Sequence, residues 1–228
     1  IDELTFKDYR GLEVKKLTAD FTYTKKNILL EQLAMNTPNS EMKGRVELKY
    51  DRKDFSDFNN KVVFDVEFDK ASIASNDLNF FYNEFGKNNI FYVDTHLVGT
   101  LNNFTTHNLK LTDKNQSEII GTANFQNLFG KENQEFYMKG SFDRITSDYE
   151  ALKIIMPRVL GKNLPSVLAK LGRVDLNGDV ELTQKYINAN VYLLSKLGIV
   201  DGDLAIQNID NIDNASYQGN IKLDNFDL

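Results

Sequence analysis

Apolar and polar residues alternate through most of the chain, with the period of two that is typical of half-buried β-strands. Residues 173–183 (RVDLNGDVELT) show the pattern most clearly, because Val174, Leu176, Val180 and Leu182 alternate with polar residues. Gly178 lies in the middle of this segment, on the apolar side. A glycine weakens the interior of a strand and contributes no side chain to its packing. Its position therefore needs an explanation.

Seven segments share this arrangement of one glycine in phase with the apolar face, and they use seven of the chain's 13 glycines. The apolar-phase positions of the seven segments are Met42, Gly44, Val46, Leu48 and Tyr50; Val93, Leu97, Gly99 and Leu101; Ile119, Gly121, Ala123 and Phe125; Phe136, Met138, Gly140 and Phe142; Val174, Leu176, Gly178, Val180 and Leu182; Val200, Gly202, Leu204 and Ile206; and Ala215, Tyr217, Gly219, Ile221 and Leu223. The spacing between the glycines varies, so this is a loose strand repeat without a fixed length. Further strands are expected in 12–24, 27–35 and 61–69.

Two segments have helical periodicity instead. In residues 75–86, Asn76 and Asp77 are candidate N-caps, and Gly86 is the expected stop. In residues 147–172, Ser147 and Glu150 have the spacing of a capping box. Pro157 and Gly161 are expected to divide this segment into two short helices, the second ending at Gly172.

The expected architecture is mainly β: antiparallel strands in one sheet, with short amphipathic helices inserted near 76–86 and 147–172. No linker-like segment divides the 228 residues, so 1–228 is expected to form a single unit. The first residues have neither an initiator Met nor a signal-peptide pattern, and the last residues are strand-like. These features suggest a fragment of a longer protein.

Composition narrows the possible functions. The net charge is -6, and no cluster of Lys and Arg exceeds a few residues, which argues against nucleic acid as a partner. The aromatic residues lie among acidic residues, which argues against a platform for single-stranded nucleic acid. Absence of Cys excludes disulfides, thiolate metal sites and Cys nucleophiles.

The sequence contains no combination of residues typical of a catalytic site. The chain is therefore not expected to be an enzyme, and no cofactor or metal is expected. His96 and His107 are interpreted as surface side chains, and the carboxylates as the solvated side of strands. The sequence DLNGD at 175–179 superficially resembles a calcium loop, but it lacks the Glu at the twelfth position and lies inside an alternating strand.

The apolar face itself remains as the candidate functional feature, and three interpretations stay open. The face could pack against a second sheet or the helices, with the glycines marking bends. It could instead line an open trough, in which the missing side chains make room for a guest. Finally, exposed edge strands could recruit another strand.

Three segments together resemble the TamB family of the AsmA-like superfamily: residues 149–183, ending in GRVDLNGDVELT; residues 197–228; and residues 17–51, in which TPNS leads into a glycine-centred strand. The resemblance implies a β-taco, which is a folded-over open sheet with an apolar inner groove. It implies a periplasmic protein of a diderm bacterium that is anchored in the inner membrane and reaches toward the outer membrane.

Two functions follow from this resemblance. One is conduction of phospholipid along the groove, with acyl chains as the ligand. The other is assembly of outer-membrane β-barrel proteins or their translocation, with a BamA-like barrel protein and barrel clients as partners. On the first reading, the groove is expected to be lined by Met42, Gly44, Val46, Leu48, Leu97, Gly99, Leu101, Ile119, Gly121, Phe125, Met138, Gly140, Phe142, Val174, Leu176, Gly178, Val180, Leu182, Val200, Gly202, Leu204, Ile206, Tyr217, Gly219, Ile221 and Leu223.

Overall fold

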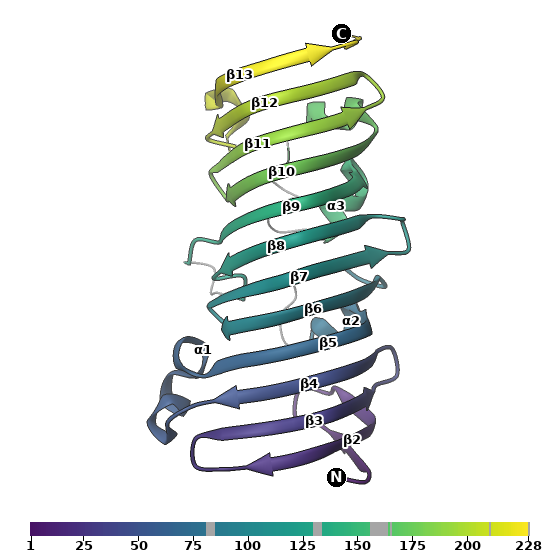
Figure 1. The fold of residues 1–228 in the computed structure, drawn as a ribbon, viewed down its shortest axis with the longest axis vertical. Coiled ribbons are helices and arrows are strands. Elements are labelled where there is room, and N and C mark those ends of the chain that lie inside the picture. Colours follow the sequence, from purple (N-terminus) through teal and green to yellow (C-terminus); the bar gives the residue numbers. More distant parts are fainter. Residues whose placement is uncertain (81–84, 130–133, 156–163, 165, 210, 228) are drawn as a thin grey trace.

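The computed structural model describes residues 1–80, 85–129, 134–155, 164, 166–209 and 211–227. In these ranges the chain forms one 13-stranded antiparallel sheet whose strands follow one another in sequence order (Figure 1). The strands are β1 (Leu4–Lys7), β2 (Glu13–Tyr23), β3 (Asn27–Asn36), β4 (Glu41–Lys49), β5 (Val63–Ala74), β6 (Ile90–Thr100), β7 (Asn103–Asp113), β8 (Glu118–Gln126), β9 (Tyr137–Asp148), β10 (Arg173–Thr183), β11 (Tyr186–Ser195), β12 (Gly198–Gln207) and β13 (Ser216–Asp224). This confirms the expected mainly β, antiparallel architecture.

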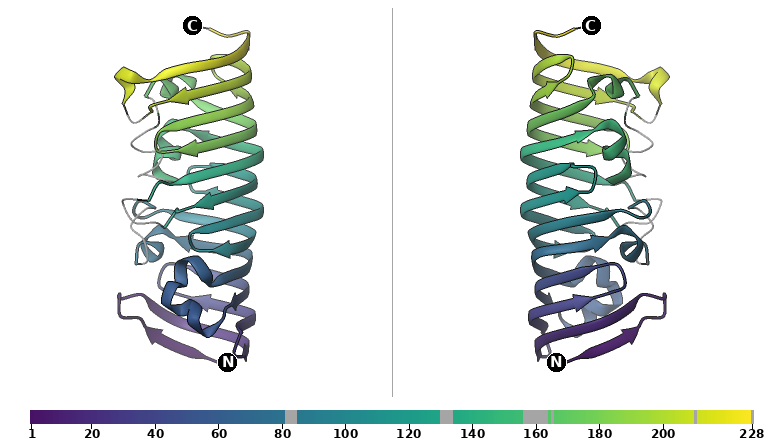
Figure 2. Two further views of the ribbon diagram at one scale, coloured as in Figure 1. Left: turned by 90° about the vertical axis from the view of Figure 1, so that its left-hand side faces the viewer. Right: turned by 90° about the vertical axis from the view of Figure 1, so that its right-hand side faces the viewer.

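The sheet is open, because β1 and β13 lie at its two ends and each pairs with one neighbour within the described residues. Figure 2 shows that the strands bend, so that the sheet is concave toward one side and the helices and several connections lie on that side. The helical elements are η1 (Arg52–Asp57), α1 (Phe58–Lys61), α2 (Ser75–Leu78), α3 (Tyr149–Ile155), η2 (Ser166–Leu171) and η3 (Ile212–Asn214).

Bulges on alternate strands accompany this bend. The pairing register shifts in β3, β5, β7 and β9, where each strand carries an extra residue relative to its neighbours. Three of the bulges contain a non-glycine residue in the left-handed region: Gln32 (φ 48°), Lys70 (φ 53°) and Asn108 (φ 51°). Because a bulge kinks its strand and increases the local twist, a column of bulges on alternate strands bends the whole sheet along one line.

The first expected helical segment is shorter than its pattern indicated. Helix α2 covers only Ser75–Leu78, so the expected N-caps Asn76 and Asp77 lie inside it. Asp77 is buried and its carboxylate accepts hydrogen bonds from Thr37 Oγ1 and Ser40 Oγ, both at 2.5 Å. Its role is therefore to hold α2 against the β3–β4 turn. Gly86 (φ 67°) does not stop this helix, which ends eight residues earlier.

The second segment does contain two short helical elements, α3 and η2. Its expected cap is wrong, because Ser147 belongs to β9 and is buried with its Oγ 3.0 Å from that of Ser117. The Asp148 side chain caps α3 instead, accepting a 2.8 Å hydrogen bond from the Ala151 N–H. Gly172 (φ 69°) ends η2 as expected, whereas Pro157 and Gly161 lie outside the described residues.

Candidate functional site

The pairing register places the apolar residues of neighbouring strands in continuous rows on one face of the sheet. Residues directly opposite each other on paired strands project on the same side, so a row can be followed from partner to partner. One row consists of Phe21, Leu30, Val46, Val66, Leu97, Thr106, Ala123, Gly140, Val180, Ala189, Leu204 and Gly219. It crosses the sheet from β2 to β13 and contains one polar side chain, that of Thr106.

A second row runs parallel to the first and contains no polar residue except the tyrosines at its two ends. It consists of Tyr23, Ile28, Leu48, Phe64, Gly99, Phe104, Phe125, Met138, Leu182, Ile187, Ile206 and Tyr217. Further rows on the same face pass through Leu176 and Val200, and through Phe142 and Ile221. We call this surface the apolar face.

Register and alternation place the predicted groove residues on this one face, with a single exception. Leu101 lies in the turn between β6 and β7 and so belongs to neither strand. The structure thus brings the predicted residues together geometrically.

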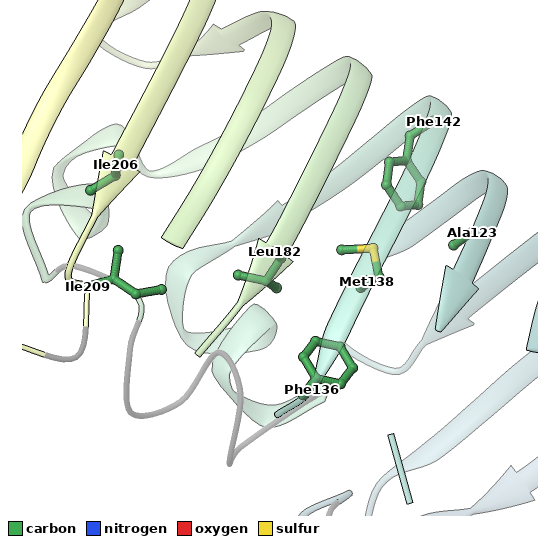
Figure 3. Packing of buried hydrophobic residues seen from close by; sticks show 7 residues of the cluster. All are labelled: Ala123, Phe136, Met138, Phe142, Leu182, Ile206 and Ile209. Carbon is green, nitrogen blue, oxygen red and sulfur yellow. The ribbon is translucent and has the colours of Figure 1, made fainter. Parts of the chain in front are cut away.

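Coverage of the apolar face is uneven. Around β8–β12 a cluster of buried residues packs tightly, and Figure 3 shows Met138, Phe142 and Leu182 in this cluster together with Ile209 from the segment after β12. The cluster consists of Ala123, Phe136, Met138, Phe142, Leu182, Ile206 and Ile209. On β13, by contrast, Tyr217, Ile221 and Leu223 are 59%, 45% and 48% exposed.

Aromatic residues from connecting segments cover one margin of the apolar face. Phe129 stacks on Phe104, with ring centroids 5.9 Å apart, and Phe58 of α1 meets the edge of Phe64 at 5.7 Å. These contacts identify the apolar face as the concave side that carries the helices in Figure 2. Among the described residues, no second sheet packs against it.

Six of the seven in-phase glycines have a positive φ, and at each of them an added Cβ would meet the backbone of a neighbouring strand. A Cβ built on Gly178 (φ 131°) would lie 2.2 Å from the backbone oxygen of Asn190 on β11. A Cβ on Gly44 would lie 1.8 Å from the backbone oxygen of Glu67 on β5, and Gly121, Gly202 and Gly219 have the same type of backbone contact. Because the neighbouring strand occupies this position, no residue with a Cβ fits at these glycines without moving the paired strand. They allow close approach of two strands where the sheet bends, which was the other interpretation.

The opposite face is polar and charged. On β4 and β5, Asp65 accepts a 2.8 Å hydrogen bond from Lys49 Nζ, and its other oxygen lies 3.5 Å from Arg45 Nη1. The Lys49 ammonium, with a smaller contribution from His96, lowers the pKa of the Asp65 carboxyl below its ordinary value. Glu47 lies in the same network, and its pKa is lowered chiefly by the hydrogen bond that Asn27 donates. The carboxyl groups are therefore held ionised, as suits a solvated face.

Both histidines lie on this polar face, and sequence patterns missed their proximity. They occupy directly opposite positions, His96 on β6 and His107 on β7, with ring centroids 5.9 Å apart. His96 is only partly exposed and contacts Asp65, so it is more than a free surface side chain. The pair was missed because β7 was not expected: its apolar phase changes at the Asn108 bulge, from Phe104 to Leu109, which hides the alternation.

A shallow depression of about 530 Å³ crosses β9–β13. The side chains at its margin are mainly those of the polar face, among them Lys139, Asp179, Glu181, Asn190 and Asp203. Its lining also includes Val180, Ala189, Leu204 and Gly219 of the first apolar row. Asp175 and Asp179 lie in strand β10, so the DLNGD segment is not a calcium loop.

No helix among the described residues is both long and apolar enough to cross a membrane. No protein-family model matches the chain, and neither a curated protein nor a solved structure matches it.

Proposed function

We propose that this chain is a segment of a lipid conduit, whose apolar face shields phospholipid acyl chains from water. The observation that carries the proposal is the continuity of the apolar rows from β2 to β13, on the concave side of a sheet with a charged opposite face. A surface of this kind binds hydrocarbon without needing a particular polar contact.

The hydrophobic effect gives the scale of the benefit. Transfer of one methylene from water to an apolar surface is worth about 0.8 kcal/mol, so a two-chain lipid with about 30 methylenes gains roughly 20 kcal/mol from full coverage. Even half of this free energy would be many times the thermal energy RT. Because every row offers similar contacts, a chain could shift from one strand to the next without a large barrier, and the headgroup could stay in water at the open side.

The resemblance to the TamB family is consistent with this proposal and extends it. On that basis we propose that the segment acts in the periplasm of a diderm bacterium. The full-length protein would be anchored in the inner membrane and would carry phospholipid toward the outer membrane, with a BamA-like barrel as partner. The activity needs no catalytic residue.

Photo-crosslinking from adjacent positions tests the proposal. Val180 and Asp179 are neighbours on β10 that project to opposite faces, and Ile221 and Asn220 form an equivalent pair on β13. A photoreactive residue at 180 or 221 should capture phospholipid from vesicles, as identified by mass spectrometry, whereas one at 179 or 220 should not. Equal labelling of both faces, or no labelling from either, would refute a lipid-binding face.

A substitution pair separates binding from folding. Ile221→Asp places a charge on the apolar face at a position 45% exposed, where the fold can tolerate it. It should reduce extraction of a fluorescent phospholipid from vesicles, while Asn220→Asp adds the same charge to the opposite face and should have no effect. Circular dichroism and urea denaturation would establish that both variants remain folded.

A second candidate function rests on the sheet edge. All nine residues of β13 are exposed, and among the described residues β13 pairs on one side only, with β12. Such an edge can add a strand from another chain, so a scaffold for outer-membrane barrel proteins is the alternative. Photoreactive residues placed along β13 that crosslink to strands of barrel proteins, with no lipid recovered from position 180, would favour the scaffold function.

A further inference from the structure

A row of metal-ligating residues crosses three strands of the polar face. Glu67 on β5 lies opposite His96 on β6, which lies opposite His107 on β7. The chain has only two histidines among its 228 residues, and they meet at this one place. Cross-strand partners of this type have Cβ atoms about 5 Å apart, which is within reach of a shared ion.

Asp65 completes the group. One donor atom each from Asp65, Glu67 and His96 can be chosen so that all three lie within 4.8 Å of one another. His96 Nε2 is 2.9 Å from Asp65 Oδ1. An ionised carboxylate only accepts hydrogen bonds, so Nε2 carries the proton in this pair. Two ligands of one tetrahedral zinc ion, each bonded at about 2.0–2.2 Å, lie about 3.3–3.5 Å apart. An ion could therefore bind Nε2 after a small side-chain movement, with the ring proton transferred to Nδ1 so that the imidazole stays neutral.

Neighbouring cations hold the Asp65 carboxylate in place. Lys49 Nζ is 2.8 Å from Oδ2, which leaves Oδ1 directed at His96, with Arg45 at the longer distance of 3.5 Å from Oδ1. Such outer contacts orient a metal ligand. The positive charges of Lys49 and Arg45 also repel a bound cation and so lower the affinity of the site. The three carboxylates of this network (Glu47, Asp65 and Glu67) outnumber its two cationic side chains (Arg45 and Lys49), so the surroundings still carry a negative charge when the histidines are neutral.

We propose that His96, Asp65 and Glu67 bind a divalent transition-metal ion on the polar face, and that His107 rotates to supply a fourth ligand. A set of imidazole and carboxylate donors suits Zn²⁺, Ni²⁺ or Cu²⁺ and disfavours Mg²⁺ and Ca²⁺, which take oxygen ligands. Partial exposure of His96 and the nearby cations indicate a reversible site of micromolar affinity. The site lies on the face opposite the apolar rows, so it does not depend on the proposed lipid function.

Isothermal titration calorimetry of the untagged, chelator-treated protein with ZnCl₂ tests the site. We expect one ion per chain, and little or no binding of Mg²⁺. His96→Gln should weaken binding at least tenfold and Glu67→Gln severalfold. Asp179→Asn, which removes an exposed carboxylate elsewhere on the polar face, should leave it unchanged.

Cobalt(II) provides a second measurement, because its visible absorption reports coordination directly. A d–d band that His107→Gln alters and His96→Gln abolishes would support the proposed ligands. Absence of zinc binding at 1 mM, unchanged affinity in His96→Gln, or equal affinity for Mg²⁺ and Zn²⁺ would each overturn the proposal. Circular dichroism of every variant ensures that lost binding does not reflect lost folding.

Discussion

Replacement of Gly178 by Ala should destabilise the sheet severely for so small a change. The added Cβ would lie 2.2 Å from the Asn190 oxygen and 2.9 Å from the Val191 Cα, both of them backbone atoms that cannot move without parting β10 from β11. The φ of 131° adds backbone strain for any residue with a Cβ. Strain of about 1–3 kcal/mol plus relief of the clash by local separation gives an expected loss of about 2–4 kcal/mol in the free energy of unfolding.

Gly140 provides the matched control. It lies in the same row as Val180, its φ is not in the positive region, and a Cβ there would chiefly meet the Phe142 ring, at 2.5 Å. Because the contact is with a side chain that can shift within its cluster and not with the paired backbone, Gly140→Ala should cost about 1–2 kcal/mol, less than Gly178→Ala. Urea denaturation followed by circular dichroism measures both variants. Equal stability of Gly178→Ala and the unmodified protein, or a larger loss in Gly140→Ala, would refute the close-approach explanation.

This result also decides how a larger substitution is interpreted. Gly178→Leu would part β10 from β11, so a loss of lipid transport in that variant would report on folding. Exposed apolar residues such as Ile221 are the better positions for testing the groove.

Three further predictions concern stability. Leu182→Ala, at a side chain only 4% exposed in the β8–β12 cluster, should lower the free energy of unfolding by about 2–5 kcal/mol in urea denaturation, and a loss below 1 kcal/mol would contradict the packing described here. Asp77→Ala leaves Thr37 and Ser40 without their acceptor and should cost about 2–4 kcal/mol, whereas exposed Asp213→Ala should be neutral. Because the pKa of Asp65 is lowered from 3.8, its ion pairs stabilise the fold above that pH and are lost as the pH falls through the lower folded value. With chelator present, the urea midpoint should therefore fall more steeply as the pH is lowered below about 4 in the unmodified protein than in Asp65→Asn, and parallel curves would contradict this assignment.

Alternation was sufficient to predict the strands that keep one phase throughout. The strands with a glycine and no bulge, such as β4, β8 and β10, fall into this class, and their apolar residues lie on one face as expected. Strand β11 also alternates cleanly through Ile187, Ala189, Val191 and Leu193, so the same pattern predicts it.

Bulged strands were harder to read, because an extra residue moves the apolar pattern from even to odd positions. In β7 the shift at Asn108 breaks an 11-residue strand into two short pieces that resemble a loop. The proximity of His96 and His107 could not be predicted without that strand, since the two side chains meet only when β6 and β7 are paired. Likewise, no local pattern reveals that Asp77 is buried by residues 37 positions or more away in the chain.

The predicted start of the second helical segment was wrong for a related reason. Ser147 and Glu150 have capping-box spacing, yet Ser147 continues β9 and its hydroxyl group faces that of Ser117. Tertiary pairing with β8 and β10 outweighed the local capping preference by extending the strand to Asp148.

The strictly sequential order of the strands makes the sheet a molecular ruler. With strands about 4.8 Å apart, the 12 intervals from β1 to β13 span about 58 Å, roughly twice the hydrocarbon thickness of a bilayer. Insertion or removal of one whole hairpin would change that span by about 10 Å without threading the chain or inverting any face. Evolution, or a designer, could therefore set the distance bridged by counting hairpins, leaving every other strand in place.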